Sequence, residues 1–140
     1  MIQDEDTAIL ARRRMEQSHV ALQEAALLRK NLNSTLGAVN RAYYAMFYAV
    51  LALLQKKGKV PSKHSGAIAL FDSEFVRKGI FPKDLSAYLH QAFVLRQESD
   101  YQAIEPVSLQ ETDEIIQHAS DFVQTVETYL SSASNSEEHI

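Results

Sequence analysis

The chain has 140 residues, no cysteine and a formal net charge of −4 at pH 7. This length suits one domain with its own core, and the lack of cysteine excludes disulfide bonds and thiolate metal sites, as expected for a cytoplasmic protein without a secretion leader. Because the overall balance is acidic, any contact with RNA has to come from a local basic surface.

A first helix is predicted from about Ala8 to Leu28. Asp4 and Asp6 can cap it, and acidic residues suit the positive N-terminal end of a helix. Its last turn leads into Arg29-Lys30, which suits a C-terminus. The three consecutive arginines at 12–14 spread around more than one face, which favours a solvated surface over a binding site.

The segment Leu36–Leu54 is the apolar centre of the sequence, and Ser34 can cap it as a helix. Its apolar residues recur at three- and four-residue steps, and the opposite side is hardly more polar. We therefore expect other helices, or a second copy, to cover it on all sides. Its length approaches that of a membrane span, but three tyrosines and Arg41 inside it, with Lys56-Lys57 after it, favour a core helix. The stripe comprises Leu36, Val39, Tyr43, Phe47, Val50 and Leu54.

A basic loop follows this central helix. Gly58 supplies a left-handed stop, and Pro61 prevents continuation. The stretch either contacts phosphate or is an ordinary solvated loop. A third helix is then predicted from about Lys63 to Lys78, ending at Gly79. The basic residues of this stretch are Lys56, Lys57, Lys59, Lys63 and His64.

Two more helices complete the predicted fold. The fourth runs from about Pro82 to Ser99, and Ser108 with Glu111 makes a capping box that opens the last, which reaches about Leu130. No strand pattern or internal repeat is visible. The sequence therefore predicts an all-α fold, an up-and-down bundle of about five helices. Residues 1–130 form the single domain, and residues 131–140 form a flexible polar tail.

Arg96 marks the candidate site, because it ends an otherwise apolar stripe of the fourth helix. A guanidinium turned toward the packed side needs an acceptor, which is a carboxylate, backbone carbonyls or a bound phosphate. Asp100 stands four residues later, so one interpretation is an Arg96–Asp100 pair that closes the helix end. Tyr101 lies about 140° from Arg96 around an unbroken helix. These two share a site only if the helix ends between them or a second subunit supplies one; otherwise Tyr101 is an ordinary half-buried aromatic.

Four sequence motifs occur in an order and spacing that resemble the HEPN domain family over about Met15 to Leu130. They are Asn40-Arg41-Ala42-Tyr43-Tyr44-Ala45-Met46-Phe47-Tyr48-Ala49, His64-Ser65-Gly66, Phe71 with Phe75-Val76-Arg77-Lys78-Gly79, and Arg96 with Asp100-Tyr101. More narrowly, they resemble the small stand-alone branch that is often encoded beside a minimal nucleotidyltransferase.

This resemblance implies a homodimer in which the arginine-bearing helices meet at a cleft between subunits. In members that cut RNA, an arginine is followed after four to six residues by a histidine, and the ribose 2′-hydroxyl attacks the adjacent phosphate without a metal. The arginine balances the phosphate charge and the histidine moves the proton. Arg96 matches the arginine, while Tyr101 stands where the histidine would be. An ordinary phenol, with a pKa near 10, is a poor base at neutral pH.

Two functional interpretations follow from the resemblance. In the first, the protein is the toxin-like component of a HEPN/nucleotidyltransferase two-gene system, and Arg96, Asp100 and Tyr101 form an RNA-cleaving site. In the second, it is a non-catalytic module that binds a nucleotide or docks the nucleotidyltransferase, with Tyr101 as a possible nucleotide acceptor. The candidate RNA or nucleotide contacts are Arg41, Tyr44, Lys63 and His64. We expect no cofactor and no metal site, because the histidines lie on separate elements.

Overall fold

The computed structural model describes the backbone of residues 2–101 and 107–138, and the side chains of residues 5–97 and 107–133. These residues form α-helices and one π-helical turn, and the described backbone contains no strand. The expected all-α fold is confirmed. The elements are α1 (Ile2–Leu32), α2 (Thr35–Lys56), α3 (His64–Phe71), η1 (Asp72–Val76), α4 (Lys83–Tyr101) and α5 (Leu109–Glu138).

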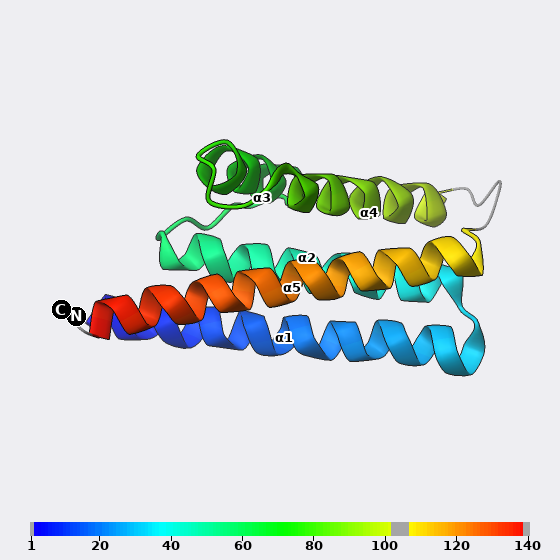
Figure 1. The fold of residues 1–140 in the computed structure, drawn as a ribbon, viewed down its shortest axis with the longest axis horizontal. Helices are drawn as coiled ribbons and strands as arrows, with labels where there is room; N and C mark the ends of the chain where they lie inside the picture. The colour runs from blue at the N-terminus through cyan, green and yellow to red at the C-terminus, as the bar shows by residue number, and fades with distance from the viewer. Residues whose placement is uncertain (1, 102–106, 139–140) are drawn as a thin grey trace.

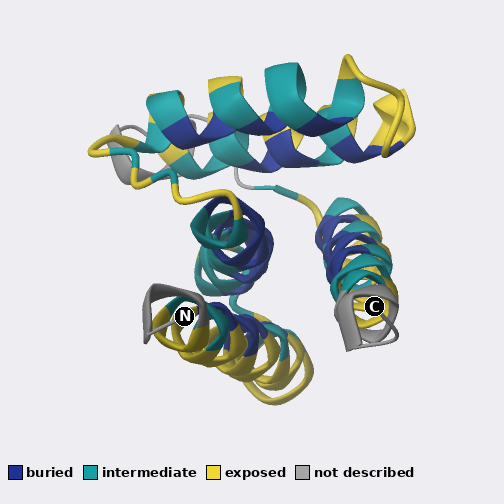
Figure 2. Cartoon of the chain, turned by 90° about the vertical axis from the view of Figure 1, so that its left-hand side faces the viewer, coloured by how far each residue is buried: buried dark blue, intermediate teal, exposed yellow. Residues whose placement is uncertain are grey.

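The helix α2 lies at the centre of the bundle and contacts each of the other four α-helices. Figure 1 shows α1, α2 and α5 running alongside one another, with α4 on the other side of α2. The short α3 runs across the long helices, so that Figure 1 shows it nearly end-on and Figure 2 shows it lengthwise. In Figure 2 the buried residues face the middle of this arrangement. Side chains of α2 can therefore meet side chains from any of the other α-helices.

The hairpin between α1 and α2 has the predicted cap. The Ser34 hydroxyl accepts a hydrogen bond from the Gly37 amide at 3.2 Å, while Asn33 adopts a left-handed backbone with φ of 50°. The Asn33 side chain in turn accepts from Arg29 at 2.8 Å. Two residues therefore reverse the chain, and α1 extends beyond the predicted bounds at both ends.

Most of α2 is buried on all sides, as its sequence predicts. Leu36 is the exception in the predicted stripe: it is 48% exposed, because it lies in the first turn beside the hairpin. Tyr44, Tyr48 and Leu51 are partly buried against the core. Within the described residues, no helix combines the length and the hydrophobicity that crossing a membrane requires.

The end of α2 follows the prediction, whereas the third helix does not remain regular. Gly58 has a φ of 71°, and the Lys59 amide donates back to the Leu54 carbonyl at 2.9 Å. The helix predicted as one unit from Lys63 to Lys78 changes into the π-helical η1, where the Arg77 amide donates to the Asp72 carbonyl at 2.8 Å. Phe71 directly precedes this widened turn and Phe75 lies within it; both are buried, so packing in the core holds the turn in place.

The last two helices agree with the predicted order, with one difference in length. Ser108 accepts a hydrogen bond from the Glu111 amide at 3.0 Å, which is the cap the sequence predicts. Beyond Leu130, α5 continues to Glu138, so the segment predicted as a flexible tail is helical through that residue. Its flexibility stays a prediction. On α4, the predicted stripe is buried through Ala92, and Phe93 and Arg96 are partly buried.

Candidate functional site

The guanidinium of Arg96 turns from α4 toward α2, in the direction that the apolar stripe predicts. Its Nε donates to Asn40 Oδ1 at 3.2 Å, and its Nη2 donates to the Tyr44 hydroxyl at 3.1 Å. The side chain is half-buried, so these two contacts on α2 fix a cation at the edge of the core. Such a preorganised guanidinium can bind a phosphate oxygen without first losing much side-chain freedom.

Two tyrosine rings lie against this guanidinium. The central carbon of the Arg96 guanidinium is 5.4 Å from the ring centroid of Tyr43 and 5.2 Å from that of Tyr44. Arg41 approaches the Tyr44 ring as well, at 4.9 Å. The attraction between a cation and the face of an aromatic ring helps to keep two positive charges close together here. Two guanidinium groups thus lie close together against the same tyrosine ring.

His64 joins this group from the first residue of α3. Its Nδ1 lies 2.7 Å from the Tyr43 hydroxyl, and its ring stacks on Phe47 with centroids 4.1 Å apart. Burial, and secondarily the charge of Arg96, lower the pKa of His64 below 6.5. Burial raises the pKa of Tyr43, so the phenol stays protonated and its O–H donates a hydrogen bond to Nδ1. In that arrangement the neutral imidazole carries its own hydrogen on Nε2 and acts as a donor. We call Asn40, Tyr43, Tyr44, His64 and Arg96 the Arg96 cluster.

The structure brings some of the predicted site residues together and leaves others apart. Tyr44, His64 and Arg96 belong to the cluster. Arg41 lies at its edge, where it also reaches Glu24 on α1 with 3.5 Å between Nη1 and Oε1. Lys63 is exposed at the start of α3 and lines a separate pocket with His64.

Asp100 and Tyr101 belong to the end of α4, and their side chains lie outside the described residues. The backbone of α4 is helical through Tyr101, so the helix does not end between Arg96 and Tyr101. Arg96 and Tyr101 can therefore share a site only if a second subunit supplies one of them. The Arg96–Asp100 pair stays a prediction.

Asn40 and Tyr43 are not among the site residues predicted from the sequence, although Asn40 contacts Arg96 and Tyr43 contacts both Arg96 and His64. A signal for Asn40 exists: it is a polar amide within the apolar central helix, one turn before Tyr44. A partly buried amide among apolar side chains favours a hydrogen-bonding partner, which here is Arg96 on α4. For Tyr43 the periodicity indicated only a core position, and its hydroxyl gave no further signal. In the described part of the chain, no three histidine, aspartate or glutamate side chains lie together as metal ligands.

Known proteins resemble this chain over most of its length. The family model described as "HEPN domain" matches residues 11–129. A "UPF0332 protein" of Thermotoga maritima is 39% identical over 109 residues, which cover 78% of this chain and 82% of that protein. Two proteins of Methanocaldococcus jannaschii, named "Putative toxin MJ0142" and "Putative toxin MJ0605", are each 36% identical over 93 residues. Those alignments cover 66% of this chain and 63% and 69% of the two proteins, respectively. The chain belongs to the HEPN domain family.

Proposed function

We propose that this chain is a toxin-like HEPN protein that cleaves RNA, with Arg96 binding the reacting phosphate in a cleft between two copies. The observation that carries the proposal is the guanidinium of Arg96, fixed by Asn40 and Tyr44 at the edge of the core. Two relatives with "toxin" in their names support the biological class. A fixed cation that faces developing negative charge is an effective means of stabilising a phosphoryl transition state.

The proposed reaction balances in bonds and protons without a metal ion. The ribose 2′-oxygen forms a bond to the adjacent phosphorus, the bond to the 5′-oxygen breaks, and a 2′,3′-cyclic phosphate and a 5′-hydroxyl result. One proton leaves the 2′-hydroxyl and one reaches the 5′-oxygen. Arg96 neutralises the phosphate, and the Nε2 hydrogen of His64 donates to a phosphate oxygen. The proton transfers are assigned to Asp100 and Tyr101 contributed by the second copy.

In this proposal the second copy docks on the face shared by α1 and α2. An open groove of about 550 Å³ runs there between the two helices, and Arg41 and Tyr48 form its α2 side. Val20 projects from α1 into the same groove and is 52% exposed. Because Arg41 touches the ring of Tyr44, a copy bound on this face would lie next to the Arg96 cluster.

The proposed partner of this dimer is a minimal nucleotidyltransferase, as the family branch implies. Such an enzyme would transfer a nucleotidyl group from a nucleoside triphosphate to the hydroxyl of Tyr101, with loss of the phenol proton and release of pyrophosphate, and would thereby block the cleft. Co-expression with the neighbouring gene product, followed by mass spectrometry of the peptide that contains Tyr101, tests this step. The expected result is the added mass of a nucleotidyl group, and an unmodified peptide would contradict it.

The cleavage itself is tested with labelled single-stranded RNA in the presence of EDTA. Arg96→Gln should lower the rate by roughly 10²–10³-fold, the effect of removing one preorganised electrostatic contact from a transition state. Arg77→Gln is the matched control, because Arg77 is an exposed arginine outside the cluster. Circular dichroism verifies that both variants fold. If the wild-type dimer leaves RNA intact, the nuclease proposal is wrong.

A second candidate function is that of a non-catalytic RNA- or nucleotide-binding module. It is favoured by the hydrogen bond between the Tyr43 hydroxyl and His64 Nδ1. This bond occupies Nδ1, so the imidazole can act only as a donor, through Nε2. Among the described residues of the cluster, none is then a proton acceptor suited to neutral pH. Under this candidate, RNA remains intact but binds to the protein, and Arg96→Gln weakens that binding while Arg77→Gln does not.

A further inference from the structure

A pocket of about 290 Å³ opens where the first half of α1 meets the last turn of α2 and the second half of α5. We call it the end pocket; Ala8, Arg12, Lys56 and Glu127 are among the residues around it. Pockets that enclose a drug-sized ligand usually exceed about 300 Å³, so this one suits a smaller molecule. Lys56 lies about 18 Å along α2 from Tyr44, at 1.5 Å per residue, and the end pocket is therefore separate from the Arg96 cluster.

The floor of the end pocket belongs to the hydrophobic core. Ala11 and Met15 are buried in that core, and Leu130 packs against it. The short side chains of Ala8 and Ala11 leave space between the three helices. Side chains that line unfilled space lose packing contacts, so a ligand with an apolar group gains by occupying it. The flexible thioether of Met15 can adapt to the shape of such a group.

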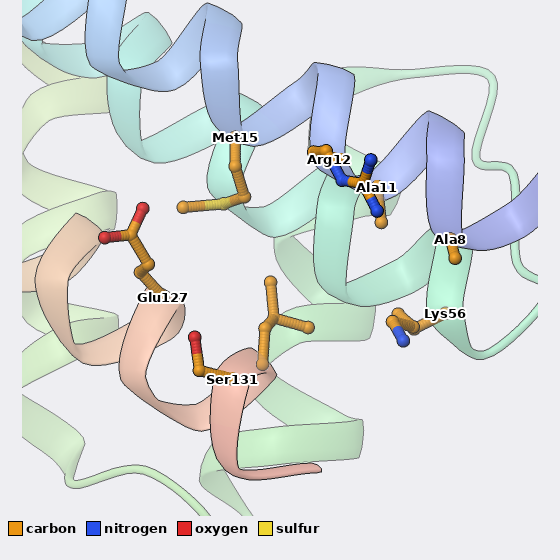
Figure 3. Close-up of a pocket in the computed structure, with 8 residues that line it drawn as sticks. Ala8, Ala11, Arg12, Met15, Lys56, Glu127 and Ser131 are labelled. Atoms are coloured by element: carbon orange, nitrogen blue, oxygen red, sulfur yellow. The ribbon is translucent and has the colours of Figure 1, made fainter. Parts of the chain in front are cut away.

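The end pocket also carries charges of both signs, which are held apart. Figure 3 shows Arg12 and Lys56 on one side of the pocket and the carboxylate of Glu127 on the other. Within the described part of the chain, neither the Arg12 nor the Lys56 side chain takes part in a hydrogen bond or an ion pair. An anionic group bound on this side would supply the acceptor that both cations lack.

Glu127 and Ser131 bring hydrogen-bond acceptors to the opposite side, one helical turn apart on α5. The Glu127 carboxylate contacts Nε2 of His19, but its two oxygens offer about four acceptor positions, so room remains for a second donor. The groove between α1 and α2 differs, because Arg41 lies 3.5 Å from Glu24 there and the two charges compensate each other. The charges on the two sides of the end pocket are not paired in this way.

We propose that the end pocket binds a small amino acid that carries an apolar group. Arg12 and Lys56 bind its carboxylate. Glu127 and Ser131 accept hydrogen bonds from its ammonium group, and its apolar part packs against Met15. One small zwitterion thus supplies a charge to each side of the pocket and an apolar group to the floor. Because this binding needs neither RNA cleavage nor a second copy, it succeeds or fails independently of the proposed function.

The test measures the binding of leucine and of δ-aminovalerate to the full chain by calorimetry. Leucine carries both charges on one carbon, whereas δ-aminovalerate carries them at the two ends of an apolar chain, so the tighter ligand identifies the class of amino acid. Isocaproate and valerate have the same carbon chains without the ammonium group, and each should bind more weakly than its parent. If neither amino acid binds, or if loss of the ammonium group leaves the affinity unchanged, the proposal is overturned.

Three charge variants locate the ligand. Arg12→Gln and Lys56→Gln should each weaken binding of the amino acid about tenfold, the usual effect of losing one hydrogen bond to a charged group. Glu127→Gln should weaken binding of the amino acid by a similar factor and leave binding of the matching carboxylate, isocaproate or valerate, unchanged. Lys30→Gln on α1 and Glu114→Gln on α5 are the matched controls, because both change exposed residues outside the pocket, and both should leave the affinity unchanged.

Ala8→Leu tests the open floor. A leucine side chain at this position occupies the space beside Met15, so binding of the amino acid should be lost, and circular dichroism verifies that the variant folds. Arg96→Gln should leave this binding intact, because the Arg96 cluster is a separate site. If the affinity changes in Arg96→Gln but not in Ala8→Leu or the charge variants, the ligand lies outside the end pocket and the proposal is overturned.

Discussion

The hydroxyl of Tyr43 and Nδ1 of His64 lie 2.7 Å apart and join the middle of α2 to the first residue of α3. Burial keeps the phenol protonated, because it raises the pKa of Tyr43. Burial and the nearby charge of Arg96 act in the opposite direction on the pKa of His64, which they lower. Both effects favour an uncharged pair in which Tyr43 donates and His64 accepts.

The first prediction concerns the titration of His64. Arg96→Gln removes a positive charge, so the pKa of His64 should rise toward 6.5. Because the folded pKa is depressed, the unfolded chain binds more protons, and stability should fall as the pH drops below about 6.5 toward the folded value. Titration of the His64 imidazole signals by NMR measures the pKa, and urea unfolding at several pH values measures the stability. An unchanged His64 titration in Arg96→Gln would show that the two side chains do not interact.

The second prediction concerns the hydroxyl of Tyr44. Tyr44→Phe removes the oxygen that accepts from Arg96 Nη2 and keeps the ring beneath the guanidinium. The free energy of unfolding should fall by about 1 kcal/mol, the usual net value of one hydrogen bond. RNA binding should weaken, because Arg96 is less well oriented. Urea denaturation and a filter-binding assay measure the two effects.

Tyr48→Phe is the matched control for this change. Its ring lies beside that of Tyr44, with 5.8 Å between the centroids, and the substitution leaves both Arg96 hydrogen bonds in place. The two variants should therefore differ in RNA affinity. Equal effects would mean that the hydroxyl of Tyr44 does not position Arg96.

The third prediction tests the proposed dimer face. Val20→Asp places a charge in the groove between α1 and α2, where a second copy would have to desolvate it. Sedimentation equilibrium should show a dimer for the wild type and a monomer for this variant. Leu109→Asp is the control, because Leu109 is comparably exposed, at 42%, and starts α5. A wild-type monomer, or a Val20→Asp dimer, contradicts the proposed face.

The fourth prediction concerns Glu74, which ties the loop after α2 to η1. Its carboxylate accepts from Lys78 at 2.8 Å, from Lys59 at 3.0 Å and from Lys57 at 3.3 Å. These hydrogen bonds lower the pKa of Glu74 from 4.5 to about 2. A depressed carboxyl pKa stabilises the fold above the unfolded value, and that contribution is lost as the pH falls through the folded value.

Glu74→Gln should therefore be less stable than the wild type at neutral pH, and the difference should shrink between about pH 4.5 and about pH 2. Urea unfolding followed by circular dichroism at several pH values measures this difference. Glu114→Gln, an exposed change on α5, serves as the control and should parallel the wild type. A pH-independent difference for Glu74→Gln would exclude a contribution from its ionisation.

Much of the fold was predictable because its signals are local. The cap at Ser34, the left-handed Gly58 and the apolar periodicity of α2 depend on neighbouring residues, and the structure contains all three. The change from α3 to η1 was not predictable in this way. It depends on how Phe71 and Phe75 pack against the rest of the core, which periodicity within one segment does not specify.

The sequence by itself determined that Arg96 turns inward, because Arg96 lies on the apolar stripe of its helix and that stripe faces the core. Only the tertiary structure decided what meets it there. Asn40 is 56 residues away along the chain, and His64 reaches the same cluster from a third helix. Contacts between separate helices depend on how those helices pack, and packing is a property of the whole bundle. The same reason explains why the pocket enclosed by α1, α2 and the loop after α2 cannot be predicted from the sequence alone.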